Sequence, residues 1–209
     1  MLTLGIDTAL SSCSVAVLDG ALVLASRSLL LEKGHAEHLA PLVVEALAEV
    51  GIAARELDRA GVVVGPGGFA GVRVGVAFAR GLAIGTRLKT VGMTSLEALA
   101  RGVAEAAGPV AAVVNANRGE VYAALYDADA ILIEPFVAAP EAALQRLIAA
   151  GANGAAAVGD GVRLVDPRGA HFRDLGAPPI DPAVVARFAA AALAPTAAPA
   201  PLYLRDPDA

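Results

Sequence analysis

LTLGIDTALSSCSVAVLDG, residues 2–20, contains two short apolar runs that frame a polar turn beginning at Asp7. The runs cover 2–6 and 14–18, and an Asp-Gly pair follows the second one. An Asp-Gly pair between apolar runs is a strong hairpin signal, and the next apolar run covers 21–31. The sequence therefore predicts that the chain opens with three antiparallel strands.

A long amphipathic helix is predicted next, over residues 35–50. Its apolar residues recur at helical spacing, and Gly51 supplies the stop that glycine commonly provides at a helix C-terminus. A glycine-bounded apolar run at 61–65 predicts a strand that is buried on both faces. The other elements expected here are a Gly-rich loop at 66–71, a helix at 72–87, a strand at 89–93 and a helix at 94–107.

Gly108-Pro109 interrupts this pattern, and we place a domain boundary there, between 1–107 and 108–209. Residues 4–19 and 112–127 share one pattern of strand, acid or amide, turn and second strand, which indicates an internal duplication. Hairpins combined with strand–helix units predict an α/β protein with mixed sheets in two related halves. The elements expected after the boundary are strands at 110–114, 120–126, 131–137 and 155–158, helices at 141–150 and 182–193, a loop at 159–179 and an extended stretch at 195–201.

The composition excludes several classes of protein. Of 209 residues, 56% are hydrophobic and 18% are charged, which excludes intrinsic disorder. The net charge of −5 argues against a chain that binds nucleic acid by itself. The single cysteine, Cys13, fits a reducing cytoplasm, and the sequence indicates neither a signal peptide nor a membrane span of about 18 residues.

Two segments could hold a phosphate group. Asp7-Thr8 ends the first strand, where a carboxylate could hold a hydrated metal ion or orient a phosphate. The stretch GPGGFAGVRVG, residues 65–75, separates a strand from a helix, and its glycines would let backbone N–H groups approach an anion. The structural alternatives are an Asp-initiated turn and close helix–sheet packing. The candidate phosphate site consists of Asp7, Thr8, Gly65, Gly67 and Gly68.

His35 and His38 suggest a zinc site at the start of the first predicted helix. Their spacing, with Glu32 and Glu37 nearby, is compatible with zinc. No further group of ligands accompanies them, and the alternative is an exposed helix start at which Glu37 interacts favourably with the helix dipole. We therefore expect no metal site, and local motifs assemble no catalytic triad.

Four segments together resemble the TsaB family. They are the opening GIDTA with CSVA, the stretch from the Gly-rich loop to Ala83, NANRGEVY at 115–122 and PLYLR at 201–205. The segments lie in the family's order and span nearly the whole chain. The opening is also similar to the phosphate-binding hairpin of the actin/Hsp70/sugar-kinase superfamily, and this implies two ribonuclease-H-like halves of the actin-like ATPase type.

The resemblance implies a role in making N6-threonylcarbamoyladenosine beside the anticodon of tRNAs. In that family TsaB is a non-catalytic relative that pairs with the catalytic subunit TsaD, and an ATPase, TsaE, joins the pair. We accordingly expect no catalysis and no cofactor on this chain alone, with ATP or ADP and Mg²⁺ at the complex. The chain would contact tRNA only through the complex, lie in the cytoplasm and not in a membrane, and could form a homodimer in isolation.

The pairing surface that the resemblance implies lies on the two helices at 35–50 and 72–87. Its predicted residues are His38, Leu42, Glu45, Arg73, Gly75, Ala79 and Gly81. Glycines on the second helix would allow another helix to pack closely. A bulky charge at Gly75 or Gly81 is therefore expected to disrupt pairing without unfolding the protein.

Three positions depart from the family pattern. Gly68 stands where the family usually has Ser, Ala70 where it has Thr, and Asn115 where it has Asp. An amide cannot act as a base or balance Mg²⁺ as a carboxylate does, so the departures favour a non-catalytic role. The alternative is an active small ATPase or kinase of the same superfamily, for which Asp7 would be essential.

Overall fold

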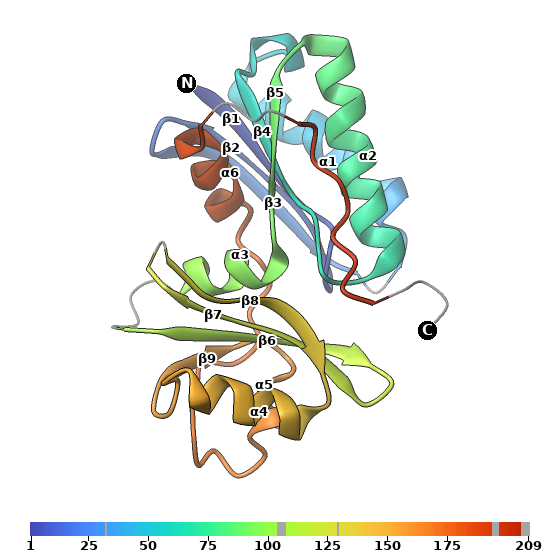
Figure 1. The fold of residues 1–209 in the computed structure, drawn as a ribbon. Coiled ribbons are helices and arrows are strands. Elements are labelled where there is room, and N and C mark those ends of the chain that lie inside the picture. Colours follow the sequence, from blue (N-terminus) through green and yellow to red (C-terminus); the bar gives the residue numbers. More distant parts are fainter. Residues whose placement is uncertain (32, 104–107, 129, 194–196, 206–209) are drawn as a thin grey trace. The chain divides into compact units, whose positions relative to one another are not determined.

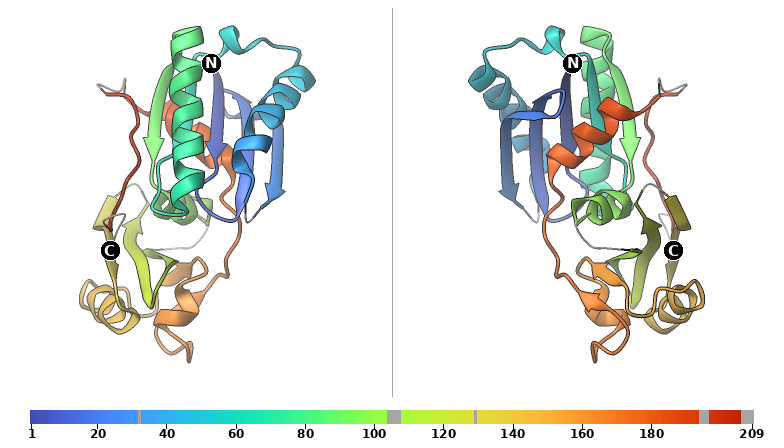
Figure 2. Two further views of the ribbon diagram at one scale, coloured as in Figure 1. Left: turned by 90° about the vertical axis from the view of Figure 1, so that its right-hand side faces the viewer. Right: turned by 90° about the vertical axis from the view of Figure 1, so that its left-hand side faces the viewer.

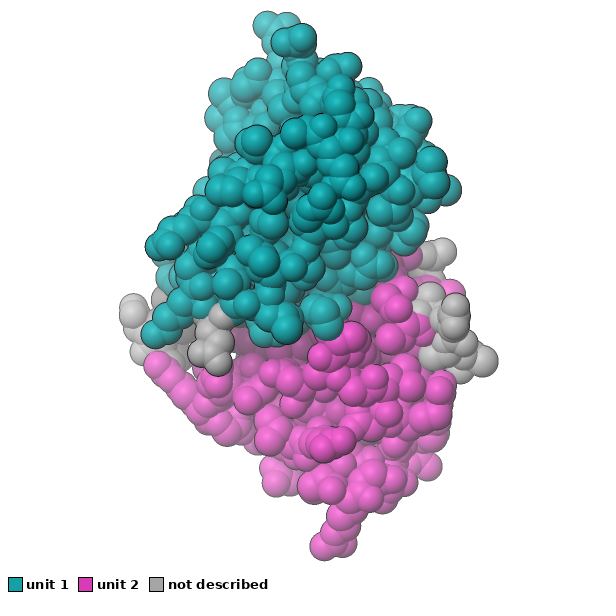
Figure 3. Space-filling view, turned by 180° about the vertical axis from the view of Figure 1, so that it is seen from behind, with its two compact units in different colours: residues 1–98, 179–202 teal, residues 99–178, 203–209 magenta. Residues whose placement is uncertain are grey.

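The computed structural model describes residues 1–31, 33–103, 108–128, 130–193 and 197–205 (Figure 1). Its contacts divide the chain into two compact units, each made of two segments. The first unit comprises 1–98 and 179–202, and the second comprises 99–178 and 203–209 (Figure 3).

The first unit contains a mixed five-stranded sheet in the order β3-β2-β1-β4-β5. The first three strands pair antiparallel, which confirms the predicted hairpins, and β4 and β5 extend the sheet by parallel pairing. The apolar runs occupy its centre because β1 and β2 are buried on both faces. The bounds are β1 Leu2–Asp7, β2 Ser12–Asp19, β3 Leu22–Leu30, β4 Arg59–Val63 and β5 Lys89–Met93.

Helices cover both faces of this sheet, with α1 and α2 on one face and α6 on the other (Figure 2). The apolar stripe of α1 is buried as its spacing predicts, and Gly51 in the left-handed conformation ends the helix. α6 lies very close to the sheet, because a Cβ on Gly5 would stand 2.0 Å from the Pro182 carbonyl oxygen. The bounds are α1 His35–Val50, the 3-10 turn η1 Ala54–Glu56, α2 Phe69–Thr86, α3 Ser95–Gly102 and α6 Pro182–Ala191.

The second unit repeats the strand arrangement of the first. Its sheet has the order β10-β9-β6-β7-β8, with antiparallel pairing from β6 to β8 and parallel pairing from β6 to β10. The shared topology confirms the α/β fold of two related halves. The bounds are β6 Val110–Asn117, β7 Glu120–Asp127, β8 Ala130–Ala138, α4 Pro140–Ala149, β9 Ala156–Val158, α5 Val162–Val165 and β10 Arg173–Asp174.

Several details differ from the sequence-based expectations. α2 begins at Phe69 rather than at residue 72, and the segment 159–179, expected to be a loop, contains α5 and β10. The division into these two units also differs from the predicted boundary between residues 107 and 108. The reason is that α6 packs on the first sheet, although it follows most of the second unit in the chain. The end of the helix expected at 94–107, Glu32 and the start of the stretch at 195–201 lie outside the described residues.

Among the described residues, α2 is the one helix that is long and apolar enough to cross a membrane. The sequence had not led us to expect such a helix. A single helix of this kind is weak evidence, because core helices of other proteins pass the same test. Here the buried side of α2 packs against the first sheet through Gly71, Val72, Gly75, Val76 and Ala79.

Candidate functional site

Asp7 is the last residue of β1 and lies fully buried where the turn to β2 begins. Its Oδ1 accepts a hydrogen bond from the Ala9 backbone N–H at 2.9 Å, and its Oδ2 accepts one from the Ser12 hydroxyl at 3.0 Å. Burial raises the pKa of Asp7 to about 6, although these hydrogen bonds act in the opposite direction. Both carboxylate oxygens thus already serve the turn itself, as an Asp-initiated turn requires.

The Gly-rich loop packs directly on this turn. The Thr8 hydroxyl donates to the Gly71 carbonyl oxygen at 2.7 Å, and the Gly68 N–H donates to the Ala9 carbonyl oxygen at 2.8 Å. A Cβ on Gly67 would stand 2.2 Å from the Ala9 oxygen, and one on Gly71 would stand 2.0 Å from the Thr8 oxygen. The space that these glycines open is therefore filled by the backbone of the same chain.

The entrance of the loop is also held by neighbouring segments of the first unit. Gly65 has a φ of +97°, which glycine adopts without strain, and its carbonyl accepts the Ser95 N–H at 2.9 Å. The Leu202 N–H donates to the Val64 carbonyl at 2.8 Å, so the C-terminal segment lies against the same loop. The loop is fixed on both sides by hydrogen bonds within the unit.

All five members of the candidate phosphate site therefore come from the contiguous turn and loop of the first unit. Asp7 is buried, and each of its carboxylate oxygens already accepts one hydrogen bond from the turn. The Gly68 N–H donates to the Ala9 oxygen, and a Cβ on Gly67 would overlap that same oxygen, so this part of the loop packs on the turn.

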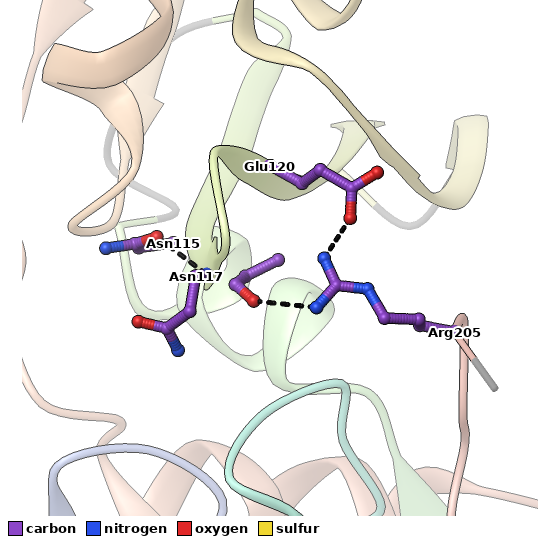
Figure 4. Close-up of polar contacts among 5 residues, drawn as sticks. Asn115, Asn117, Glu120 and Arg205 are labelled. Atoms are coloured by element: carbon purple, nitrogen blue, oxygen red, sulfur yellow. Dashed lines mark hydrogen bonds and ion pairs between the residues drawn. The ribbon is translucent and has the colours of Figure 1, made fainter. Parts of the chain in front are cut away.

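The second unit has a corresponding turn and loop. Asn115 follows the core of β6 and is exposed, its Oδ1 accepting the Asn117 N–H at 2.8 Å (Figure 4). Asp160 accepts the Asn115 N–H at 2.8 Å, and its neighbours Gly159 and Gly161 lie directly against β6. The sequence reading missed Asp160, although its position between two glycines just after β9 matches that of the Gly-rich loop after β4.

Arg205 holds the other side of the same turn. Its guanidinium donates to the Ala116 carbonyl oxygen at 3.3 Å and forms an ion pair with Glu120 (Figure 4). Its side chain is largely buried. Arg205, the final residue of the PLYLR segment, thereby joins this segment to the NANRGEVY segment. Both segments carry the family resemblance.

A second buried aspartate, Asp166, organises the segment after α5. Its carboxylate accepts the N–H groups of Ala170, His171 and Phe172 at 2.8 to 3.0 Å. Burial alone would raise the pKa of Asp166, but these donors and the charge of His171 outweigh it, so that the pKa lies below its usual value. The sequence reading missed this residue, for which the Asp-Pro-Arg-Gly turn was the available signal.

The predicted pairing surface is only partly exposed. Leu42, Gly75 and Ala79, which were predicted as residues of the partner interface, are buried inside the first unit. A Cβ on Gly75 would stand 2.4 Å from the Thr8 hydroxyl oxygen, so a Glu there would disturb the fold itself, contrary to the expectation. A Cβ on Gly81 meets no atom within 4 Å. The exposed members are His38, Glu45, Arg73 and Gly81.

The two histidines weighed as zinc ligands lie in the first turn of α1. His38 is exposed and His35 is half-buried. Across the described ranges, no three residues of the types His, Cys, Asp and Glu gather closely enough to hold a metal ion. Glu32, their proposed neighbour, lies outside those ranges.

A family model described as TsaD, tRNA N6-adenosine threonylcarbamoyltransferase, matches residues 29–175 of the chain. The tRNA threonylcarbamoyladenosine biosynthesis protein TsaB of Escherichia coli is 36% identical over 131 residues, covering 62% of this chain and 56% of its own length. The TsaB protein of Bacillus subtilis is 33% identical over 137 residues, covering 66% and 60%. The chain thus spans little more than half of the length of these curated relatives.

Other proteins are similar to this chain over nearly its full length. An uncharacterised protein of Mycobacterium tuberculosis is 32% identical over 213 residues, covering 99% of this chain and 92% of its own. A solved structure from Pseudomonas aeruginosa, described as similar to peptidase YeaZ, superposes with a TM-score of 0.81 at 28% identity, covering 98% of this chain and 99% of its own. YeaZ from the same organism superposes with a TM-score of 0.73 at 25% identity, covering 89% of each chain.

Proposed function

Since the chain belongs to the TsaB family, with the actin-like ATPase type of fold, we propose that it is a non-catalytic partner subunit of the tRNA N6-threonylcarbamoyladenosine transferase. In this role it binds and supports the catalytic subunit TsaD. The observation that supports this proposal most directly is the match of the TsaD family model to residues 29–175. The match indicates that this chain and the transferase share a common ancestor.

The closed turn of the first unit supports the non-catalytic part of the proposal. An ATPase of this superfamily needs a carboxylate that can balance Mg²⁺ and a loop that can receive phosphate. Asp7 has both oxygens engaged, and Gly67 and Gly71 contact the backbone of the turn. Opening the site would break the hydrogen bonds of Thr8 and Gly68 that hold the loop.

The remaining members of the complex are proposed by the same reasoning. TsaE would join the pair of subunits, and ATP or ADP with Mg²⁺ would bind at the complex rather than on this chain. The net charge of −5 supports indirect contact with tRNA, because phosphate neutralisation requires a basic surface. We propose a cytoplasmic location for the complex.

Reconstitution of tRNA modification tests the proposal. Purified TsaD and TsaE with substrate tRNA, ATP, Mg²⁺ and an activated threonylcarbamoyl donor should form N6-threonylcarbamoyladenosine at a rate that rises at least tenfold when this chain is added. The chain alone should hydrolyse no ATP, and Asp7→Asn should leave the modification rate within about twofold of wild type. Modification that is independent of this chain would refute the proposal.

An active small ATPase or kinase is the competing function, and the same material distinguishes it. In that case the chain alone would hydrolyse ATP in the presence of Mg²⁺, and Asp7→Asn would abolish hydrolysis. The matched control is Asp166→Asn, which changes a buried aspartate of the second unit by the same atoms. ATP hydrolysis that Asp7→Asn abolishes and Asp166→Asn leaves intact would show that the chain is an ATPase.

A further inference from the structure

β3 forms the edge of the first sheet opposite β5 (Figure 2). Among the described residues β2 is the one strand that pairs with β3, so its other side is open. The Leu31 N–H donates to the Ser11 carbonyl oxygen at 3.0 Å, and in antiparallel pairing every second residue before Leu31 also bonds to β2. The N–H and C=O groups of Ser26, Ser28 and Leu30 therefore point to the open side.

The other three sheet edges are short or protected. β5 has five residues and lies against the C-terminal segment, since a Cβ on Gly92 would stand 3.3 Å from Pro199. β10 has two residues. β8 contains Pro135, which has no N–H to donate, and its pairing with β7 is irregular at two places. β3 has nine residues and no proline, so of the four edges it is the one that is long and unprotected.

The exposed side chains of β3 are mostly apolar. Leu22, Leu29 and Leu30 are 65%, 38% and 75% exposed. The single charged residue of the strand, Arg27, forms an ion pair with Glu49 on α1. A second strand could therefore approach this edge without meeting an unpaired charge, and it would cover apolar surface.

We infer that β3 pairs with β3 of a second copy of this chain, antiparallel about a two-fold axis, so that two five-stranded sheets become one continuous sheet. A second copy fits because the open side is complementary to itself. An axis at Ser28 places Ser28 opposite Ser28 and Ser26 opposite Leu30, and all of these residues direct their backbone groups outward. Leu29 of each copy then lies opposite the aliphatic stem of Arg27 of the other. This inference goes beyond the proposed function and does not depend on it.

The oligomeric state of the full chain tests the inference. Sedimentation velocity over about 1 to 100 µM should show a monomer–dimer equilibrium with a dissociation constant in the micromolar range. Leu30→Lys should weaken dimerisation roughly tenfold, because it places a charge on the edge of each copy. The matched control is Ile84→Lys on α2, which is 85% exposed and lies outside β3, and it should leave the dissociation constant within about twofold. Circular dichroism checks that both variants are folded.

A cysteine cross-link tests the alignment of the two strands. Ser28 is exposed and lies on the inferred axis, so Ser28→Cys should give a disulfide between two copies when copper phenanthroline is added as the oxidant. The native Cys13 is buried and should not react. Ala77→Cys on α2 is the matched control, because this position is also exposed, and it should remain monomeric on a non-reducing gel.

Two results would overturn the inference. One is a wild-type chain that stays monomeric at about 100 µM. The other is a dimer that Ile84→Lys weakens and Leu30→Lys leaves intact, because this would assign the contact to α2. Neither result affects the proposed function, which the rate of tRNA modification tests separately.

Discussion

The two units have the same strand order and use the same turn in opposite ways. In the first unit the turn buries Asp7, and the Gly-rich loop closes over it. In the second unit the corresponding Asn115 is exposed, and the loop after β9 contributes Asp160, which accepts the Asn115 N–H. Duplication has preserved the backbone arrangement while the polar groups at the turn have diverged.

The helix that follows each loop shows the consequence. In the first unit the loop leads into α2, which has 18 residues. In the second unit it leads into α5, which has four residues. Close packing of the first loop fixes the start of a long helix, whereas the second loop needs only to turn the chain. In the first unit the packed turn and loop thus support the first turn of α2 through the hydrogen bonds of Thr8 and Gly68.

Glycine substitution on α2 should give the largest effect. Gly71→Ala should lower the free energy of unfolding by about 3 kcal/mol, because its Cβ would overlap the Thr8 carbonyl oxygen. Gly81→Ala on the same helix should instead raise it by about 0.5 to 1 kcal/mol, because that position is open. Urea unfolding followed by circular dichroism measures both. Equal changes in the free energy of unfolding for the two variants would show that the turn does not occupy the space beside Gly71.

The two buried aspartates should respond to pH in opposite directions. The pKa of Asp7 rises to about 6 on folding, from about 3.9 in an unfolded chain, so its burial penalty is absent below both values and complete above pH 6. Asp7→Asn removes the carboxylate and should gain roughly 2 kcal/mol relative to wild type between pH 4 and pH 7. Unfolding curves at several pH values measure this gain.

Asp166→Asn is the control for that prediction. Because folding lowers the pKa of Asp166, its carboxylate stabilises the protein above its unfolded pKa, and the benefit disappears as the pH falls through the folded value. This variant should therefore lose stability relative to wild type as the pH rises from 3 to 6. If the stability of both variants relative to wild type changed with pH in the same direction, the proposed difference between Asp7 and Asp166 would be contradicted.

A helix cap should give the smallest effect. Gly68 is the N-cap of α2, has extended dihedral angles and provides no side-chain hydrogen bond. Gly68→Ser would restore the residue that is usual in the family, and its Cβ would meet only the Ala9 oxygen, at 3.6 Å. The hydroxyl could cap the helix and raise the melting temperature by one or two degrees, since the gain over Gly is a few tenths of a kcal/mol. A lowered melting temperature would show that the loop does not tolerate the hydroxyl.

Periodicity and turn signals predicted most of the fold. The Asp-Gly pair after β2, the apolar stripe of α1 and the echo of 4–19 in 112–127 were sufficient for the hairpins, the helix and the duplication. The return of α6 to the first sheet was not predictable, because its determinants are distant in sequence. Gly5 and Gly61 make room for α6, yet each is an ordinary strand glycine when read locally.

The sequence named the residues of the candidate phosphate site, but it did not predict what those residues contact. The sequence identified Asp7 and the Gly-rich loop, and it left open whether the glycines face a ligand or a neighbouring backbone. Only the distances from Gly67 and Gly71 to the turn distinguish these alternatives. The burial of Gly75 was missed for a related reason, since a stripe of small residues has the same pattern whether it faces a sheet or a partner.

The position of α6 constrains the order in which the protein can be completed on the ribosome. The first sheet leaves the ribosome early, but the helix that covers Gly5 and Gly61 is translated only after all of residues 99–178. During that interval one apolar face of the nascent sheet lacks its cover, while the second unit has nearly all of its own chain available. Slow translation before residue 182 would prolong this exposure and lengthen the period in which chaperones must protect the nascent protein.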